Sequence, residues 1–332
     1  MRRYAKPAAG LVCLVALACA GCSSGADGDG SAAGSASSTA YAPYVSATTA
    51  SGLDAAGSAS AYNLAFVIAD GEDCTPTWGG TAAVDDPAVA SRISALTDSG
   101  ATVRVSFGGA SGTELAESCD SASALAEAYG QALDAAGASA ADFDVEGDAL
   151  TDSASVDLRA EAIALLQQER SDLSVSFTLP VMPSGLDADS VALLESANDR
   201  SVRVSTVNVM TMNYGSSYDG DMGDYAETSA EAAHDQLMEV FGLSDEAAWQ
   251  GLALTSMIGE NDVDNETFTL DDAAQVREFA EEKGVAWVSM WASFRDRACD
   301  AGSASGSDTD DASTDCSGVD QEDGAFAEAF SG

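Results

Sequence analysis

The chain has 332 residues, and its 55 Asp and Glu residues against 13 Lys and Arg residues give a formal charge of −42. This balance argues against nucleic acid and anionic lipid surfaces as partners, because Lys and Arg are the residues that hold phosphate groups. A single histidine, His234, excludes a zinc site built from several histidines, and a hydrophobic fraction of 46% is sufficient for a large core.

The first 22 residues have the pattern of an export signal. Arg2, Arg3 and Lys6 form a positive start, and the apolar run from Ala8 to Ala18 is too short to span a bilayer as a stable helix. The pattern resembles a bacterial lipoprotein signal in which Cys22 is the lipidated first residue of the mature chain. An ordinary secretory signal is the alternative. We therefore expect an extracellular protein that is either anchored to the membrane through this lipid alone or secreted.

Residues 23–40 are mainly Ser, Gly, Ala and Asp, and they predict a flexible linker that leads into a domain over residues 41–332. Export also accounts for the cysteines. Removal of Cys13 and Cys19 with the signal, and lipidation of Cys22, would leave four of the seven. In an oxidising compartment these four predict two disulfides rather than a metal site, since none has CxxC spacing: Cys74, Cys119, Cys299 and Cys316.

Short apolar runs rich in Val, Phe and Met alternate with Ala-rich stretches of helical period along this domain. The runs predict eight strands, at residues 42–46, 63–69, 102–108, 141–147, 174–180, 207–214, 253–258 and 285–291. Helices are predicted between them, for example at 156–169 and 228–241. Thr228 with Glu231, and Thr269 with Asp272, have the spacing of capping boxes that begin helices.

Alternating strands and helices favour a parallel sheet, and eight such units in this length match a closed (β/α)₈ barrel. An open doubly wound sheet would need a Gly-rich phosphate turn after its first strand, and the sequence has none. In the barrel, the loops after the second and third strands are neighbours, which favours a disulfide between Cys74 and Cys119. Cys299 and Cys316 would then close the acidic, Gly- and Ser-rich segment between them.

Catalytic groups of such barrels lie at the carboxyl ends of the strands. The fourth predicted strand contains Asp142, Asp144 and Glu146, which alternation sends into the barrel, while Phe143 and Val145 face the helices. Three neighbouring carboxylates repel one another, which should raise the pKa of at least one of them and keep a proton available near neutral pH. The alternative is a solvated acidic strand end.

Four motifs in this order carry a resemblance to a known family. Residues 139–146 resemble the D-G-x-D-x-D-x-E signature of glycoside hydrolase family 18, the chitinases and related endo-N-acetylglucosaminidases. Residues 106–109 match S-x-G-G of strand three, residues 210–215 resemble M-T-M-D-Y-G of strand six, and residues 286–297 resemble the M-W-S-x-x-R-D end of strand eight. The resemblance covers nearly all of the chain from Tyr41.

The resemblance implies a role for each carboxylate. Glu146 would be the general acid, and Asp144 would orient the N-acetyl group of the substrate, whose oxygen acts as the nucleophile in place of a protein group. Asp142 would share charge and a proton with Asp144. Trp291 would form the floor of the sugar pocket, unless it is a core residue of the last strand. Further substrate-binding residues would be Phe107, Gly108, Met212 and Asn213.

The sequence departs from the family pattern at several of these motifs. Ser139 and Ala140 replace the first Asp and the Gly of the signature, and Asn213 replaces the acid of strand six. Met212 stands where the broad family has a Tyr that holds the acetamide. Alternation would point Tyr214 the same way as Met212, so Tyr214 is the candidate for the missing hydroxyl.

The resulting hypothesis is a bacterial chitinase-like hydrolase that cleaves β-1,4 links between N-acetylglucosamine units by a retaining mechanism. It would act as a monomer on a neutral polysaccharide or oligosaccharide, without a cofactor or a metal. One alternative is an endo-β-N-acetylglucosaminidase acting on glycoprotein glycans, and another is a catalytically silent, lectin-like protein. Two tryptophans, Trp78 and Trp249, would either line a glycan groove or pack under loops, and His234 is predicted to be a surface or packing residue.

Overall fold

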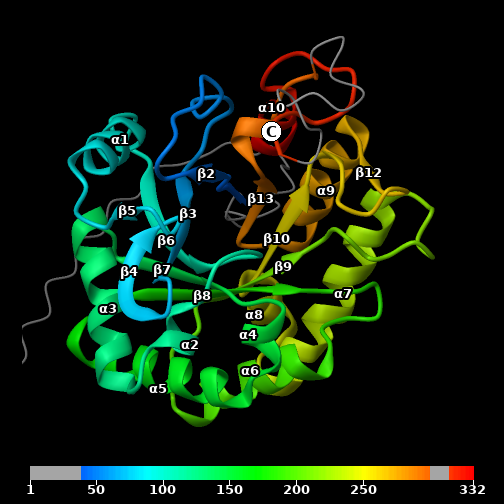
Figure 1. Cartoon of the computed structure of the whole chain (residues 1–332). Coiled ribbons are helices and arrows are strands. Elements are labelled where there is room, and N and C mark those ends of the chain that lie inside the picture. The colour runs from blue at the N-terminus through cyan, green and yellow to red at the C-terminus, as the bar shows by residue number, and fades with distance from the viewer. Residues whose placement is uncertain (1–38, 300–313) are drawn as a thin grey trace, which may run out of the picture. The chain divides into compact units, whose positions relative to one another are not determined.

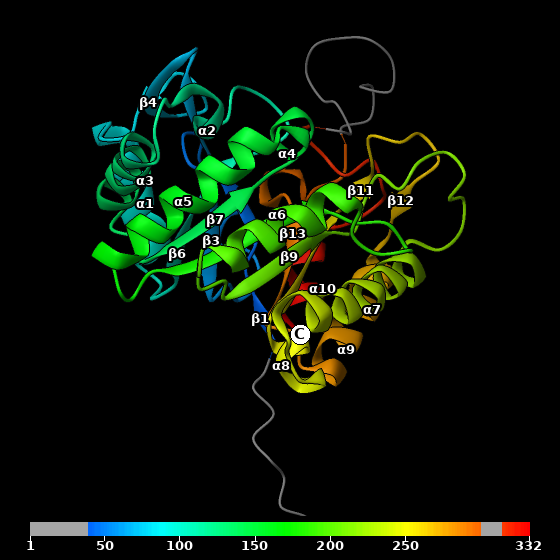
Figure 2. The same ribbon diagram turned by 90° about the horizontal axis from the view of Figure 1, so that it is seen from below.

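The computed structural model describes residues 39–299 and 314–332. The predicted signal at 1–22, the lipidation site Cys22 and residues 23–38 of the predicted linker lie outside these ranges. Within them, parallel strands form a barrel, and helices surround it (Figures 1 and 2). No helix of the described part of the chain combines the length and the apolar character needed to cross a membrane.

In the described part of the chain the barrel has eight strand positions, and two short strands share the first of them. The hydrogen-bonded order runs from β13 (Trp287–Trp291) through β10 (Leu252–Met257), β9 (Thr206–Met210), β8 (Ser174–Pro180), β7 (Ala140–Asp144) and β6 (Thr102–Gly108) to β3 (Ala61–Asp70). The first strand position closes the barrel, because β1 (Ala40–Tyr41) pairs with β13 and β2 (Tyr44–Ser46) pairs with β3, both in parallel. Pro43 separates the two pieces, since proline has no N–H for a ladder. This closure confirms the (β/α)₈ barrel.

Helices and two hairpins connect the strands of the barrel. An antiparallel hairpin of β4 (Asp73–Trp78) and β5 (Ala82–Ala83) follows β3, and another of β11 (Gly259–Glu260) and β12 (Thr267–Phe268) follows β10. A 3₁₀ turn, η1 (Ser293–Arg295), follows β13. The helices are α1 (Pro87–Thr97), α2 (Leu115–Ser118), α3 (Ala122–Ala136), α4 (Asp148–Thr151), α5 (Ser153–Glu169), α6 (Ala188–Asp199), α7 (Met222–Phe241), α8 (Asp245–Gln250), α9 (Leu270–Lys283) and α10 (Ala325–Ser331).

Helix starts show where the sequence signal holds and where it fails. The capping box of Thr269 and Asp272 is confirmed, because both of its hydrogen bonds form at the start of α9. The box at Thr228 is wrong, since α7 begins at Met222 and its N-cap is Asp221. Thr228 instead donates its hydroxyl to a carbonyl one turn earlier in the helix. Any Ser, Thr or Asp can mimic a cap in sequence, and here the earlier one is used.

Aromatic packing on the outer face of the sheet fixes the direction of its side chains. Phe107 of β6 and Phe143 of β7 are buried against Tyr129 of α3, with ring centroids 4.8 and 5.0 Å from that tyrosine. Because alternation then points their neighbours inward, Ser106 and Asp142 face the barrel interior. Phe107 therefore packs under helices, and the prediction that it binds substrate is wrong.

The two tryptophans left open by the sequence are packing residues. Trp78 is fully buried within β4, and the ring of Trp249 stacks on His234 at 4.2 Å between centroids. Neither lines a groove for a glycan. The predicted disulfides are confirmed, since Cys74 is bonded to Cys119 and Cys299 to Cys316.

Candidate active site

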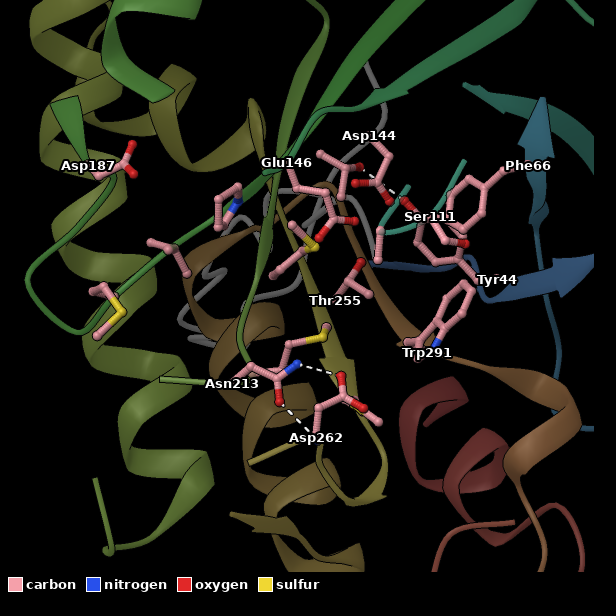
Figure 3. A pocket seen from close by; sticks show the side chains of 18 residues that line it. Tyr44, Phe66, Ser111, Asp144, Glu146, Asp187, Asn213, Thr255, Asp262 and Trp291 are labelled. Atoms are coloured by element: carbon pink, nitrogen blue, oxygen red, sulfur yellow. Dashed lines mark hydrogen bonds between the residues drawn. The ribbon is translucent and has the colours of Figure 1, made fainter. Parts of the chain in front are cut away.

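A cavity of about 380 Å³ opens at the carboxyl ends of the barrel strands. Its walls come from strands β2, β3, β7, β8, β9, β10 and β13 and the loops that follow them, so it lies where barrels of this kind carry their chemistry (Figure 3). The predicted residues Asp144, Glu146, Met212, Asn213 and Trp291 all line it. The structure thus brings together side chains from the fourth, sixth and eighth strand positions of the barrel, at the ends of β7, β9 and β13.

Asp142 lies beneath this cavity in a ring of hydroxyl groups. The hydroxyls of Tyr44 and Ser106 are 3.0 and 2.7 Å from its Oδ2 atom. Those of Ser176 and Thr178 are 2.7 and 2.9 Å from Oδ1. The side chain is 1% exposed, so these hydroxyls replace the water that a carboxylate would otherwise require.

Asp144 and Glu146 follow on the same side of the chain, and Asp144 has fewer partners. It is buried, and its Oδ1 atom has no hydrogen-bond partner among the residues that the structure describes. Burial, together with the charges of Glu146 and Asp142, raises the pKa of Asp144 well above its ordinary value. Burial also raises the pKa of Glu146, whereas its hydrogen bond with Asp144 lowers it and the charge of Asp262 raises it further. The predicted rise in at least one pKa is confirmed.

An aromatic wall forms one side of the cavity. The rings of Phe66 and Trp291 are stacked 5.5 Å apart with their planes 20° from parallel, and Tyr44 meets the edge of Trp291 at 5.8 Å. Figure 3 shows these three rings together, beside Asp144. A flat apolar wall of this kind suits the C–H faces of a sugar ring. Trp291 is partly exposed here, so its reading as a core residue of the last strand is wrong.

Methionine and polar side chains also line the cavity, and Met257 lies beside Trp291 in the sheet. Met182, Met210, Met212 and Met257 contribute thioethers. Asn213 donates its amide to Asp262 at 2.9 Å, and the backbone N–H of Asp262 donates back to the Asn213 side chain at 3.0 Å (Figure 3). Sequence reasoning missed Tyr44, Phe66 and Asp262, because they belong to no motif.

Tyr214 is not part of the cavity, and its predicted role is wrong. Strand β9 ends at Met210, and Asn213 adopts a left-handed conformation with φ 56°, so alternation no longer applies between residues 212 and 214. The buried Tyr214 ring packs against Tyr218 of the same loop, and its hydroxyl lies 3.4 Å from that of Ser229 in α7.

Gly108 also lies outside the cavity, yet its lack of a side chain matters. Its φ is 99°, and an ideal Cβ would collide with the carbonyl oxygen of Asp144. The next residue, Gly109, donates its N–H to that same oxygen at 3.0 Å. Gly108 therefore supports the backbone of Asp144 by letting β6 approach it closely, and it does not bind substrate as predicted.

A second cavity of about 320 Å³ adjoins the first across the same two carboxylates. Asp144, Glu146 and Ala110 line both cavities, and Gly112 and Asp148 belong to the second alone. Glu146 thus stands between two spaces, which is the position of a group that acts on a bond joining two units. Among the residues that the structure describes, no cluster of three or more His, Cys, Asp or Glu side chains could hold a metal ion.

Comparison with known proteins reveals similar chitinases. The chain is 34% identical over 275 residues to an Escherichia coli protein named "Probable bifunctional chitinase/lysozyme", covering 77% of this chain and 31% of that protein. It is 32% identical over 274 residues to Endochitinase 11 of Metarhizium anisopliae, covering 77% and 52%. The chain thus spans about a third to a half of the length of these curated relatives. No family model matches the chain.

Solved structures agree with these relatives. The catalytic domain of a hyperthermophilic chitinase from Pyrococcus furiosus is 29% identical, with a TM-score of 0.76 over 88% of this chain and 94% of that one. Catalytic-site mutants of active domain 2 of the thermostable chitinase from the same organism, complexed with chito-oligosaccharides, give 29% and 0.75 over 88% and 93%. In sequence and in barrel fold, the chain is thus similar to proteins that are named chitinases.

Proposed function

We propose that this chain is a glycoside hydrolase that cleaves β-1,4 links between N-acetylglucosamine units of chitin or chito-oligosaccharides. The observation that carries the proposal is the position of Glu146, which stands between two cavities beside the buried Asp144. The raised pKa of Glu146 favours its protonated form, which can give a proton to the oxygen of the bond that breaks. Similarity to proteins named chitinases supports the choice of substrate.

The mechanism we propose has the substrate supply its own nucleophile. Glu146 protonates the glycosidic oxygen as its bond to the anomeric carbon breaks, and the acetamide oxygen of the sugar on the Trp291 side attacks that carbon. Water then gives a proton to Glu146, attacks the anomeric carbon and opens the cyclic intermediate, which restores the acetamide. Asp144 orients the acetamide and balances the positive charge that develops on it. Four hydroxyls surround Asp142 below Asp144 and hold its carboxyl group in place. No hydroxyl of Tyr214 reaches this space, so the acetamide is held without it.

A glycoprotein glycan is the second candidate substrate, and a silent lectin is the third. Both would use the same pocket for an N-acetylglucosamine unit. Retention of Glu146 with a raised pKa argues against the lectin, since a binding protein needs no proton donor. An endo-β-N-acetylglucosaminidase would differ only in the loops that receive the rest of the glycan.

The test of the function compares one purified sample on two substrates, chitin oligomers and a high-mannose glycoprotein. We expect cleavage of the oligomers, and Glu146→Gln should abolish it while oligosaccharide binding stays nearly intact. The matched control is Glu239→Gln, which alters an exposed carboxylate that lines neither cavity and should leave cleavage unchanged. Products should retain the β configuration, because two inversions occur in sequence. A first product of α configuration, or cleavage of cello-oligosaccharides that lack the acetamide, would refute this mechanism.

We further propose that the protein acts outside the cell, attached through lipid on Cys22 or secreted. The signal pattern at residues 1–22 supports this location, and the two disulfides of the described domain fit an oxidising compartment. The domain would act as a monomer on a neutral polymer, and light scattering would measure its mass. Incorporation of labelled palmitate into the native chain and not into Cys22→Ser would support the anchor, and equal labelling would refute it.

A further inference from the structure

The pair formed by Asn213 and Asp262 introduces a carboxylate at the mouth of the main cavity. Asn213 follows β9, and Asp262 lies in the loop between β11 and β12. Their two hydrogen bonds are reciprocal, one through side chains and one through the Asp262 backbone. Both residues line the same cavity as Glu146 and remain exposed in the free protein.

The loop that carries Asp262 is docked at further points. Gly215 donates its backbone N–H to buried Glu266 at 2.7 Å, and Asn265 donates its side-chain amide to the carbonyl of Tyr218 at 2.7 Å. These bonds link the loop after β9 to the loop after β11 at two residues that follow Asp262. The carboxylate is therefore held in place before any substrate arrives.

We propose, on the basis of the function proposed above, that Asp262 is a positioning residue for the proton of Glu146 and that Asn213 holds it at the cavity mouth. Asn213 occupies the position at which the M-T-M-D-Y-G motif has an acid, and Asp262 supplies a carboxylate there from another loop. The negative charge of Asp262 favours the protonated form of Glu146, which is the form that donates to the glycosidic oxygen.

Other ionisable groups face Glu146 and set the background for this effect. One tyrosine and a set of carboxylates line one or both cavities with it: Tyr44, Glu114, Glu117, Asp144, Asp148, Asp187 and Asp262. Asp144 acts on Glu146 in the opposite direction, because it donates a hydrogen bond that stabilises the charged form. The charge of Asp262 therefore opposes the effect of Asp144 on the pKa of Glu146.

One substitution removes the negative charge of Asp262 and keeps both of its hydrogen bonds with Asn213. In Asp262→Asn, the side-chain oxygen still accepts from Asn213 and the backbone N–H still donates. The alkaline limb of the kcat/KM profile should move to lower pH by about 0.2–0.7 unit, as expected for one exposed charge. The shift should shrink in high salt.

Two further variants separate charge from loop docking. Asn265→Ala loosens the loop and leaves every cavity charge in place, so the alkaline limb should stay at its wild-type pH. The double change Asn213→Asp with Asp262→Asn exchanges the partners and preserves both bonds, so the limb should return towards wild type. An unmoved limb in Asp262→Asn, an equal shift in Asn265→Ala, or no return in the double variant would overturn the proposal.

A measurement without substrate keeps this inference separate from the proposed function. The carboxyl ¹³C resonance of Glu146 can be titrated in the free protein and recognised by its absence in Glu146→Gln. Its midpoint should fall in Asp262→Asn by the same amount as the kinetic limb. If wild-type protein fails to cleave chito-oligosaccharides, the proposed function is wrong, and the titration still decides the role of Asp262. An unchanged midpoint would refute that role.

Discussion

Replacement of Gly108 by alanine tests how strictly strand β6 supports Asp144. Gly108 has φ 99°, which L residues avoid. An ideal Cβ would stand 3.3 Å from the Asp144 carbonyl carbon and 3.4 Å from Cγ of Glu114, with the Asp144 carbonyl oxygen much closer. That oxygen accepts the Gly109 N–H at 3.0 Å, so Asp144 cannot retreat without breaking a backbone hydrogen bond.

The magnitude follows from these two effects. The left-handed conformation costs about 1–2 kcal/mol, and a broken buried backbone bond adds about 1–3 kcal/mol. Gly108→Ala should therefore lower the free energy of unfolding by about 2–5 kcal/mol, or the Tm by roughly 3–8 °C in a domain of this size. Because Asp144 must move, kcat on chito-oligosaccharides should fall about 100-fold.

Gly137→Ala provides the matched control. Gly137 ends α3 with φ 64°, and an ideal Cβ there meets no atom within 4 Å. This change should lower stability by only about 1–2 kcal/mol and leave kcat unaltered. Thermal unfolding followed by circular dichroism, with hydrolysis rates of the same samples, measures both. Equal destabilisation of the two variants, with full activity in Gly108→Ala, would refute the argument.

Three further predictions concern the same domain. Because burial raises the pKa of Asp144, the folded chain binds this proton more tightly than the unfolded chain, and stability falls as pH rises above the ordinary value of 3.8. Asp144→Asn should thus raise the Tm at about pH 7, with little change at about pH 4, while it slows hydrolysis severely; a lower Tm at neutral pH would contradict this sign. Ser176→Ala removes a hydroxyl from Asp142 and should lower the free energy of unfolding in urea by about 1–3 kcal/mol, whereas no change would show that water replaces it. With a formal charge of −42, the chain should melt at a higher temperature in moderate salt than in dilute buffer, and a flat or falling Tm would refute screening.

Much of the barrel could be predicted because its signals are local. Strands β6 and β8 have the predicted bounds, since each alternates polar and apolar residues and ends at a Gly or a Pro. Within β7, alternation gave the inward direction of Asp142 and Asp144 and the outward direction of Phe143. Applied to β6, the same rule points Phe107 outward, so the correction at that residue was also available from the sequence.

The remaining site residues could not be predicted, since they depend on contacts between distant segments. Asp262 reaches the cavity only because its hairpin docks on the loop after β9, and no local pattern encodes that docking. Phe66 faces Trp291 from the other end of the chain. The prediction for Tyr214 was wrong for a different reason. The strand that was predicted to reach it ends four residues earlier, at Met210, and strand ends are poorly marked in sequence.

The position of the proton in this site follows from how the barrel treats each carboxylate of one strand. Hydroxyls surround Asp142, Asp144 is buried with an oxygen that has no partner, and Glu146 is partly exposed beyond the end of β7. Burial raises the pKa of both Asp144 and Glu146, which favours a proton on the upper two groups. Those groups border both cavities, so the raised pKa values occur at the point where a glycosidic bond would cross between them. Hydroxyls deep in the barrel therefore help to determine the protonation of an acid that they do not touch.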